Sequence, residues 1–326
     1  MTCDVLCLRP EADFERVNAL PPAGLRVVYR GPNDSDVPAL MKAARALVIP
    51  AVGPKLPNHL FEGSTVKLVQ VTGAGLDRLD LALLKQFGIS VANIPGGSNE
   101  AVAEYVVTCA SALLRRFFWA DAEIRRGNYG DFRARMIADS LLGLDGLTAG
   151  IVGFGAIGAA VAAAFHKRRC SIVLYDPAPC DPKAGEALGA RSCSLHELLS
   201  TADVVSLHVP LLPQTTNLIG ERELARMKPG AVLIQASRGG VVDEAALAAA
   251  LQSGKLGGAA VDVYSMEPPG ANHPLFALQG EAAQRVLFTP HIAGVTRQST
   301  AFLCRAAWRN VEQFLTGSES LQNIVT

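Results

Sequence analysis

The sequence predicts an α/β protein with two doubly wound parallel-sheet domains. Short apolar or β-branched runs alternate with helix-like segments along most of the 326 residues, and this alternation builds parallel sheets covered by helices on both faces. A cluster of turn-forming residues followed by a long helix interrupts it once. The length suits two domains of ordinary size, each with its own core.

The first hundred residues predict the first domain. Helix-like segments separate five expected strands and cover residues 11–17, 34–44, 57–62 and 79–87. Ligands of such sheets bind beyond the carboxyl ends of the strands, so the loops at 50–53 and 72–75 are candidate binding loops. The expected strands are Val5–Leu8, Leu25–Tyr29, Ala46–Ile49, Lys67–Val71 and Ile89–Ala92.

The loop Gly73-Ala74-Gly75 has two interpretations. Two glycines around an alanine can point consecutive backbone N–H groups at one spot, which forms a small concavity suited to a carboxylate. The same residues can also form an ordinary strand-to-helix turn. Residues alone leave both open.

Residues 93–98 are dense in turn formers and predict a hinge or domain crossing. A single long helix is expected over 99–126, because apolar residues recur there at three- and four-residue steps. The aromatic residues at 117–119 extend beyond one face, and exposed apolar clusters often mark subunit contacts. Residues 128–146 are expected to form an irregular arm.

The second domain is organised around a strand, a tight turn and a helix. Thr148–Val152 predicts the strand, Gly153, Gly155 and Gly158 supply a Gly-x-Gly-x-x-Gly turn, and 156–168 predicts the helix. The first glycine permits the turn, the second lets the backbone approach a pyrophosphate, and the third lets helix and strand pack closely. A dinucleotide can therefore sit at the positive end of this helix.

The next expected strand, Ser171–Tyr175, ends in Asp176. An acidic residue at this distance from the glycines accepts hydrogen bonds from the ribose hydroxyls. It would repel a 2′-phosphate, and residues 177–180 offer no arginine to hold one, so NAD is favoured over NADP.

Further strands are expected at 203–209, 231–236, 257–263 and 286–289, with helices at 195–199, 221–227 and 244–251. With the first two they make six parallel strands, as in a complete dinucleotide-binding sheet. The third strand leads into Val209, Pro210 and Thr215, where loop atoms come near the cofactor. His208 is expected to be a packed strand residue, because no partner motif lies nearby.

Three residue types that carry chemistry follow the last strands. Arg238 comes just after the fourth, Asp262 and Glu267 follow the fifth, and His291 follows the sixth. An arginine can hold a carboxylate, a histidine can exchange a proton, and an acid can orient the histidine. Taken singly, each has a simpler explanation, such as a surface ion pair or a capped loop histidine.

Composition limits the partners. Lys plus Arg and Asp plus Glu each total 30, so no net charge favours nucleic acid or an anionic membrane. The seven cysteines are scattered without a Cys-x-x-Cys, which argues against a disulfide framework and a zinc site and favours a reducing cytoplasm. No segment has the length and apolarity of a membrane span. We therefore expect a cytoplasmic protein with a small-molecule partner and no metal.

Over nearly its full length the chain resembles the D-isomer-specific 2-hydroxyacid dehydrogenases. Five ordered motifs with matching spacing carry the resemblance. They are Gly73-Ala74-Gly75-Leu76-Asp77, Gly153-Phe154-Gly155-Ala156-Ile157-Gly158 with Asp176, Ala236-Ser237-Arg238-Gly239, Asp262 to Glu267, and Thr289-Pro290-His291-Ile292-Ala293-Gly294.

The resemblance implies a role for each motif. Arg238 binds the carboxylate and keto oxygen of a 2-oxo acid, His291 is the general acid/base, and Glu267 is its partner. The backbone around Ala74 and Gly75 grips the substrate carboxylate, and Val52 is a candidate for lining the side-chain pocket. The residues implied at the NAD site are Gly153, Gly155, Ala156, Ile157, Gly158, Asp176, Val209, Pro210, Thr215, Ala236, Ser237, Arg238, Asp262, His291, Ala293 and Gly294.

The resemblance also implies an architecture. A Rossmann NAD-binding domain, residues 99–294, is inserted in a flavodoxin-like substrate domain made of residues 1–98 and 295–326. Members are usually homodimers joined through the helix and arm, here 99–146. The arm at 129–140 lacks the tryptophan-rich sequence of many members. The resemblance therefore does not define how the protein closes over its substrate.

Two other functions remain alternatives. Corepressors related to these dehydrogenases keep the fold as NAD(H)-sensing binding proteins, although the retained Arg238, Glu267 and His291 favour an enzyme. Phosphite or formate oxidation is less favoured, because the loop at 73–75 carries no extra cation for a compact anion. The residues do not choose among glyoxylate, hydroxypyruvate, pyruvate and bulkier acids, the direction in the cell, or strict NAD over dual NAD/NADP use.

Overall fold

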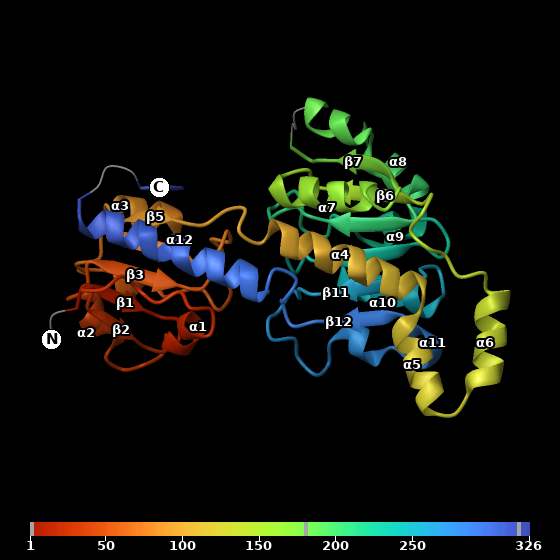
Figure 1. The fold of residues 1–326 in the computed structure, drawn as a ribbon, viewed down its shortest axis with the longest axis horizontal. Coiled ribbons are helices and arrows are strands. Elements are labelled where there is room, and N and C mark those ends of the chain that lie inside the picture. Colours follow the sequence, from red (N-terminus) through yellow and green to blue (C-terminus); the bar gives the residue numbers. More distant parts are fainter. Residues whose placement is uncertain (1–2, 179–181, 318–320) are drawn as a thin grey trace. The chain divides into compact units, whose positions relative to one another are not determined.

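The computed structural model describes residues 3–178, 182–317 and 321–326. Cys180 lies outside the described residues. The chain divides into two compact units (Figure 1), which we describe separately. Unit 1 is Met1–Ser98 with Val295–Thr326, and unit 2 is Asn99–Gly294.

Unit 1 contains a five-stranded parallel sheet in the order β2-β1-β3-β4-β5. This is the flavodoxin-like order that we predicted. The central register aligns Ile49 at the end of β3 with Val71 at the end of β4, so the loops that follow these two strands begin side by side. The strands are β1 (Val5–Cys7), β2 (Val27–Tyr29), β3 (Ala46–Ile49), β4 (Leu68–Val71) and β5 (Ser90–Ala92).

Helices cover both faces of this sheet because its buried residues alternate between two apolar clusters. Leu47 and Ile49 face a cluster that includes α2 and α3, whereas Ala46 and Val48 face a cluster with α1 and α12. Residues 57–62 were expected to be a helix and form only a 3₁₀ turn, η1 (Asn58–Phe61). The helices are α1 (Glu11–Glu15), α2 (Val37–Met41), α3 (Leu81–Gln86) and α12 (Arg297–Leu315).

Unit 2 contains a seven-stranded parallel sheet in the order β12-β11-β10-β9-β6-β7-β8. The six predicted strands are present. The seventh, β8, has only two exposed residues at the sheet edge, so its sequence shows no apolar run. The strands are β6 (Thr148–Val152), β7 (Ser171–Tyr175), β8 (Arg191–Ser192), β9 (Val204–Leu207), β10 (Val232–Gln235), β11 (Gly258–Val261) and β12 (Val286–Phe288).

This order contains the 3-2-1-4-5-6 arrangement of the Rossmann fold, with β12 added beyond it. One face of the sheet packs against α4 and α7, and the other packs against α8, α9 and α10. The helical elements are α4 (Asn99–Leu114), α5 (Phe117–Arg125), α6 (Tyr129–Ala138), α7 (Ala156–His166), η2 (Pro182–Leu188), α8 (Leu195–Thr201), α9 (Glu221–Arg226), α10 (Glu244–Gln252), η3 (Pro274–Ala277) and α11 (Gly280–Ala283).

The prediction of one long helix over 99–126 was wrong. The helix breaks between α4 and α5 at Arg116, whose φ of +53° lies in the left-handed region. The break redirects the chain so that Trp119 becomes buried. Its ring lies edge-on to Phe132 at 5.3 Å and under the guanidinium of Arg135 at 4.6 Å. This contact comes from residues beyond the helix, which periodicity within 99–126 does not show.

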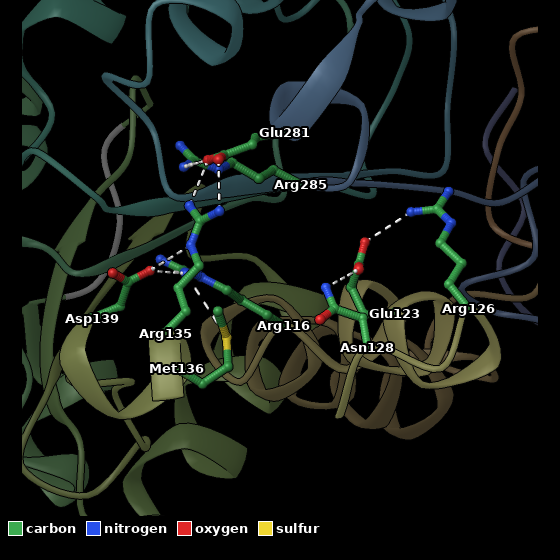
Figure 2. A network of polar contacts seen from close by, with 9 residues as sticks. All are labelled: Arg116, Glu123, Arg126, Asn128, Arg135, Met136, Asp139, Glu281 and Arg285. Atoms are coloured by element: carbon green, nitrogen blue, oxygen red, sulfur yellow. Dashed lines mark hydrogen bonds and ion pairs between the residues drawn. The ribbon is translucent and has the colours of Figure 1, made fainter. Parts of the chain in front are cut away.

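The prediction of an irregular arm over 128–146 was also wrong, because α6 occupies ten of these residues. Polar contacts attach α6 to the rest of unit 2 (Figure 2). Arg135 makes a bidentate pair with Glu281 at 2.7 and 2.8 Å, and Arg116 pairs with Asp139. The helix has a single buried residue, Phe132, so its sequence carries little apolar periodicity.

None of the helices in the three described segments is long and apolar enough to cross a membrane.

Candidate active site

The glycine turn connects β6 to α7, and packing explains two of its three glycines. Gly153 has a φ of +92°, and a Cβ on it would lie 2.7 Å from the carbonyl of His208. A Cβ on Gly158 would lie 2.0 Å from the carbonyl oxygen of Gly153. Both positions therefore require glycine for the close approach of turn, helix and neighbouring strand.

Gly155 differs from the other two glycines. A Cβ added to it would meet no described atom within 4 Å, and its backbone, with φ −75° and ψ −166°, suits any residue. Gly155 and Ala156 are exposed at the N-terminus of the 11-residue α7. This end offers unpaired N–H groups and a positive dipole end to a pyrophosphate, with Ile157 and Gly158 in its first turn.

Asp176 lies at the end of β7, beside the glycine turn. Its Oδ2 accepts a hydrogen bond from the Phe154 N–H at 2.6 Å, and its Oδ1 accepts one from the Ala178 N–H at 2.8 Å. A carboxylate oxygen can accept a second hydrogen bond, so both oxygens retain capacity for ribose hydroxyls. The residues around the turn therefore fit the adenosine end of NAD.

The buried residue Thr215 holds the loop after β9. The Thr215 hydroxyl donates to the Pro210 carbonyl at 2.6 Å and accepts from the Leu212 N–H at 2.7 Å. These bonds shape the loop that begins with Val209 and Pro210. Contacts of these three residues with NAD remain a prediction.

His208 is packed at the end of the same strand. Its Nε2 lies 2.8 Å from the Ser206 hydroxyl, and its Nδ1 is buried without a partner among the described residues. Burial lowers the pKa of the His208 imidazole to about 3. The ring is therefore neutral at pH 7.

The turn after β10 is built on Gln235, a residue that sequence reasoning missed. Its Oε1 accepts from the Ser237 hydroxyl at 2.8 Å, and its Nε2 donates to the Arg238 carbonyl at 2.9 Å. Arg238 Nη1 donates to the Ser237 carbonyl at 2.8 Å. A buried glutamine in the otherwise apolar run that begins at Val232 was the available signal, and Ala236 is half-buried beside it.

Asp262 organises the loop that carries the histidine. The residue is 1% exposed. Its Oδ1 accepts from the Thr289 hydroxyl at 2.6 Å and the Ile292 N–H at 2.8 Å, and its Oδ2 accepts from the Ala293 N–H at 2.9 Å. Because the carboxylate already receives three donors, its clearest role is to position this loop, which continues to Gly294. Direct contacts of Asp262, Ala293 and Gly294 with NAD remain a prediction.

His291 and Glu267 form a direct pair. His291 Nδ1 lies 2.8 Å from Glu267 Oε2, and the other carboxylate oxygen accepts from the Tyr264 N–H at 3.2 Å. Tyr264 also donates its hydroxyl to the Thr289 carbonyl at 3.0 Å. His291 has a φ of +55°, a strained conformation that these contacts hold.

Sheet register places these groups at one edge. Gln235, Val261 and Phe288 are aligned across β10, β11 and β12. The Asp262 N–H donates to the Gln235 carbonyl at 2.9 Å, and the His291 N–H donates to the Asp262 carbonyl at 2.8 Å. Arg238, Asp262 and His291 therefore follow neighbouring strand ends, at the same carboxyl edge as the glycine turn.

In unit 1, the loops after β3 and β4 lie side by side. A Cβ on Gly73 would lie 2.7 Å from Ala51 Cβ. The Ala74 carbonyl accepts from Asn93 Nδ2 at 2.8 Å, Gly75 is half-buried, and Val52 is 46% exposed. Carboxylate binding by the backbone of Ala74 and Gly75, and the lining of the side-chain pocket by Val52, remain predictions.

No cluster of three or more His, Cys, Asp or Glu residues within 3–178, 182–317 and 321–326 could hold a metal ion. A dinucleotide turn, an acid at the ribose position and a paired histidine at one sheet edge define the class of dinucleotide-dependent oxidoreductases. Comparison with known proteins places the chain within that class.

Residues 107–293 match the family model described as "D-isomer specific 2-hydroxyacid dehydrogenase, NAD binding domain". The chain belongs to this family, whose members use NAD and interconvert 2-hydroxy and 2-oxo acids. The sequence-based predictions of family, fold class, NAD and oxidoreductase activity are thereby confirmed.

Three similar proteins illustrate the range of relatives that this chain resembles. A glyoxylate reductase from Aeropyrum pernix is 35% identical over 79% of this chain and 76% of its own length. A D-3-phosphoglycerate dehydrogenase from Archaeoglobus fulgidus is 36% identical over 72% of this chain, which spans only 42% of that relative. The crystal structure of the TT0316 protein from Thermus thermophilus has a TM-score of 0.83 at 33% identity, covering 99% of this chain and 100% of that one.

Proposed function

We propose that this protein reduces a small 2-oxo acid, such as glyoxylate, hydroxypyruvate or pyruvate, to the D-2-hydroxy acid, and catalyses the reverse reaction. The observation that carries the proposal is the His291–Glu267 pair on the sheet edge that also bears the glycine turn. A paired imidazole can exchange the proton that this chemistry needs.

The NAD-binding role falls to residues at the carboxyl edge of the unit 2 sheet. The N-terminus of α7 would hold the pyrophosphate, and Asp176 would hold the adenosine ribose. When bound, NADH supplies the hydride and NAD⁺ accepts it. The turn from Ala236 to Arg238 and the loop from His291 to Gly294 would border the nicotinamide.

The chain's own residues handle the proton and the charge. Glu267 accepts a hydrogen bond from the Nδ1–H of His291. The Nε2–H of the protonated ring is therefore the group that would donate to the substrate oxygen, and the neutral Nε2 would take the proton back in the reverse direction. Nε2 has no hydrogen-bond partner among the described residues. Arg238 would bind the carboxylate and offset negative charge on the carbonyl oxygen, and Ala74 and Gly75 would bind the carboxylate through their backbone.

The test is an initial-rate panel. Glyoxylate, hydroxypyruvate, pyruvate and a bulkier 2-oxo acid are each mixed with NADH and, in parallel, with NADPH. We expect loss of the reduced-nicotinamide absorbance with at least one acid and a preference for NADH, because Asp176 would repel a 2′-phosphate. Tight NADH binding without turnover of any acid would favour a nucleotide-sensing protein instead.

We also propose a homodimer joined through 99–146. Several large apolar side chains of α5 and α6 are exposed, and Phe117, Phe118 and Ile137 are each more than half exposed. Such a concentration is typical of a protein contact surface. The six cysteines of the described residues are all free thiols, which supports a reducing compartment such as the cytoplasm.

A further inference from the structure

Arg78 is a buried cation in unit 1. The residue is 3% exposed. Its Nε donates to the Pro54 carbonyl at 2.9 Å and its Nη1 donates to the Pro50 carbonyl at 3.0 Å. Neither partner carries a charge, so these bonds do not neutralise the guanidinium.

Among the described residues, no carboxylate pairs with Arg78. Burial is the one cause that shifts the pKa of its guanidinium, and it shifts it downward. An ion-paired arginine of the same unit behaves oppositely, because Asp4 raises the pKa of Arg26. A positive charge without a partner in a nearly closed position is costly, which indicates a use for it.

The loop 50–56 closes over this guanidinium. Gly53 has a φ of +132°, and a Cβ on it would lie 3.3 Å from Arg78 Cζ. The Leu56 N–H donates to the Arg78 carbonyl at 2.9 Å. Arg78 therefore holds the loop near its start, its middle and its end.

This loop directly follows β3, while Arg78 follows the neighbouring loop after β4. The two strands end in register at Ile49 and Val71. The Arg78 side chain thus joins the two loops at the carboxyl edge of the sheet, one bearing Val52 and the other bearing Ala74 and Gly75.

We propose that Arg78 is a positioning and specificity-determining residue for the acid substrate. It fixes the loop 50–56 against the loop 73–75, and its unbalanced positive charge favours an anionic ligand there. The inference rests on the proposed function, in which Ala74 and Gly75 bind the substrate carboxylate, and on the prediction that Val52 lines the side-chain pocket. It also supplies the cation that the loop at 73–75 itself lacks.

Two variants separate charge from geometry. Arg78→Met removes both, whereas Arg78→Lys keeps the charge but cannot donate to two carbonyls in a fixed fork. Lys55→Met is the matched control, since it removes an exposed positive charge from the same loop. For each variant we would measure KM and kcat with the best 2-oxo acid and the dissociation constant of NADH.

We expect Arg78→Met to raise KM by about tenfold or more, as loss of hydrogen bonds from a charged group does, while NADH affinity stays within about twofold. Arg78→Lys should fall between it and the wild type, and Lys55→Met should change KM by less than about twofold. An unchanged KM in Arg78→Met, or an equal rise in Lys55→Met, would overturn the proposal.

Hydrogen exchange of the amides at 50–56 gives a readout that needs no activity. Faster exchange is expected in Arg78→Met and unchanged exchange in Lys55→Met. If the wild type reduces no 2-oxo acid, the proposed function fails, and the exchange rates still decide whether Arg78 holds the loop. If Arg78→Met does not fold, KM and hydrogen exchange are measured on Arg78→Lys instead. A wild-type KM together with wild-type exchange in Arg78→Lys would contradict the claim that the two guanidinium hydrogen bonds hold the loop.

Discussion

Glu267 occupies one ring nitrogen of His291 and thereby determines which nitrogen can serve the substrate. The contact of 2.8 Å between Nδ1 and the carboxylate requires a proton on Nδ1 when the ring is neutral. The same carboxylate accepts from the Tyr264 N–H, so its orientation is fixed from the backbone. A small change at Glu267 should therefore affect catalysis without disturbing the NAD site.

We expect Glu267→Gln to lower kcat by about 10²-fold or more, because a neutral amide stabilises the protonated imidazole less well. NADH affinity should stay within about twofold of the wild type. Steady-state kinetics measure kcat, and a fluorescence titration measures the dissociation constant of NADH. A wild-type kcat in this variant would remove Glu267 from the mechanism.

The partly buried His208, whose Nδ1 is shielded from solvent, predicts an acid-sensitive fold. Its pKa is lowered to about 3 by burial, while the unfolded side chain titrates near its usual value of about 6.5. The unfolded state binds the extra proton first, so this contribution to stability is complete above about pH 6.5 and is lost as the pH falls toward the folded-state pKa.

At pH 5 the His208 contribution is reduced by about 2 kcal/mol relative to pH 7. Denaturant unfolding of the wild type and of His208→Gln at both pH values measures it. We expect the wild type to lose about 2 kcal/mol more than the variant. Equal losses would show that the ring is not held neutral by the fold.

At the scale of elements, the sequence predicts structure best where the residues that determine an element lie close together in the chain. The glycine turn, both flanking elements and Asp176 follow from local spacing, and β6 and β7 have the predicted bounds. The break at Arg116 and the helix α6 depend on Trp119, Phe132 and Arg135, which meet only in the folded chain. Gln235 and Arg78 were missed because an isolated polar residue shows its partners only in three dimensions.

The turn predicts a contrast between two glycine substitutions. Gly158→Ala places a Cβ 2.0 Å from a backbone oxygen, so we expect lower thermal stability and loss of NADH binding. Gly155→Ala meets open space, so its melting temperature should change by less than about 2 °C. Its NADH affinity should fall at least about tenfold, since the second glycine admits the pyrophosphate.

Calorimetry and NADH titration of the two variants check this contrast. A Gly155→Ala protein with wild-type NADH affinity would mean that the pyrophosphate does not approach this turn.

At the scale of the whole molecule, α5 and α6 extend beyond the sheet of unit 2 (Figure 1). The pairs Arg135–Glu281 and Arg116–Asp139 hold α6 against its own unit (Figure 2). Its outer apolar side chains, such as the 61% exposed Ile137, are left for another surface. A second copy of the chain is the partner that we propose.

Light scattering should give twice the chain mass of 34.3 kDa. Ile137→Lys should shift the population toward the monomer, because a charge at the centre of an apolar contact is poorly solvated. Leu20→Lys, a control at a comparably exposed site in unit 1, should remain a dimer. A monomeric wild type at micromolar concentration would exclude the arm as a stable interface.

The central claim is that His291 transfers the proton in an NADH-dependent reduction of a 2-oxo acid. The most direct measurement compares wild-type and His291→Ala protein with the best acid of the panel, and analyses the product on a chiral column. We predict a D-2-hydroxy acid from the wild type and a kcat reduced by about 10²-fold or more in His291→Ala, with NADH still bound. Near-wild-type turnover in His291→Ala, or an L product from the wild type, would contradict the account.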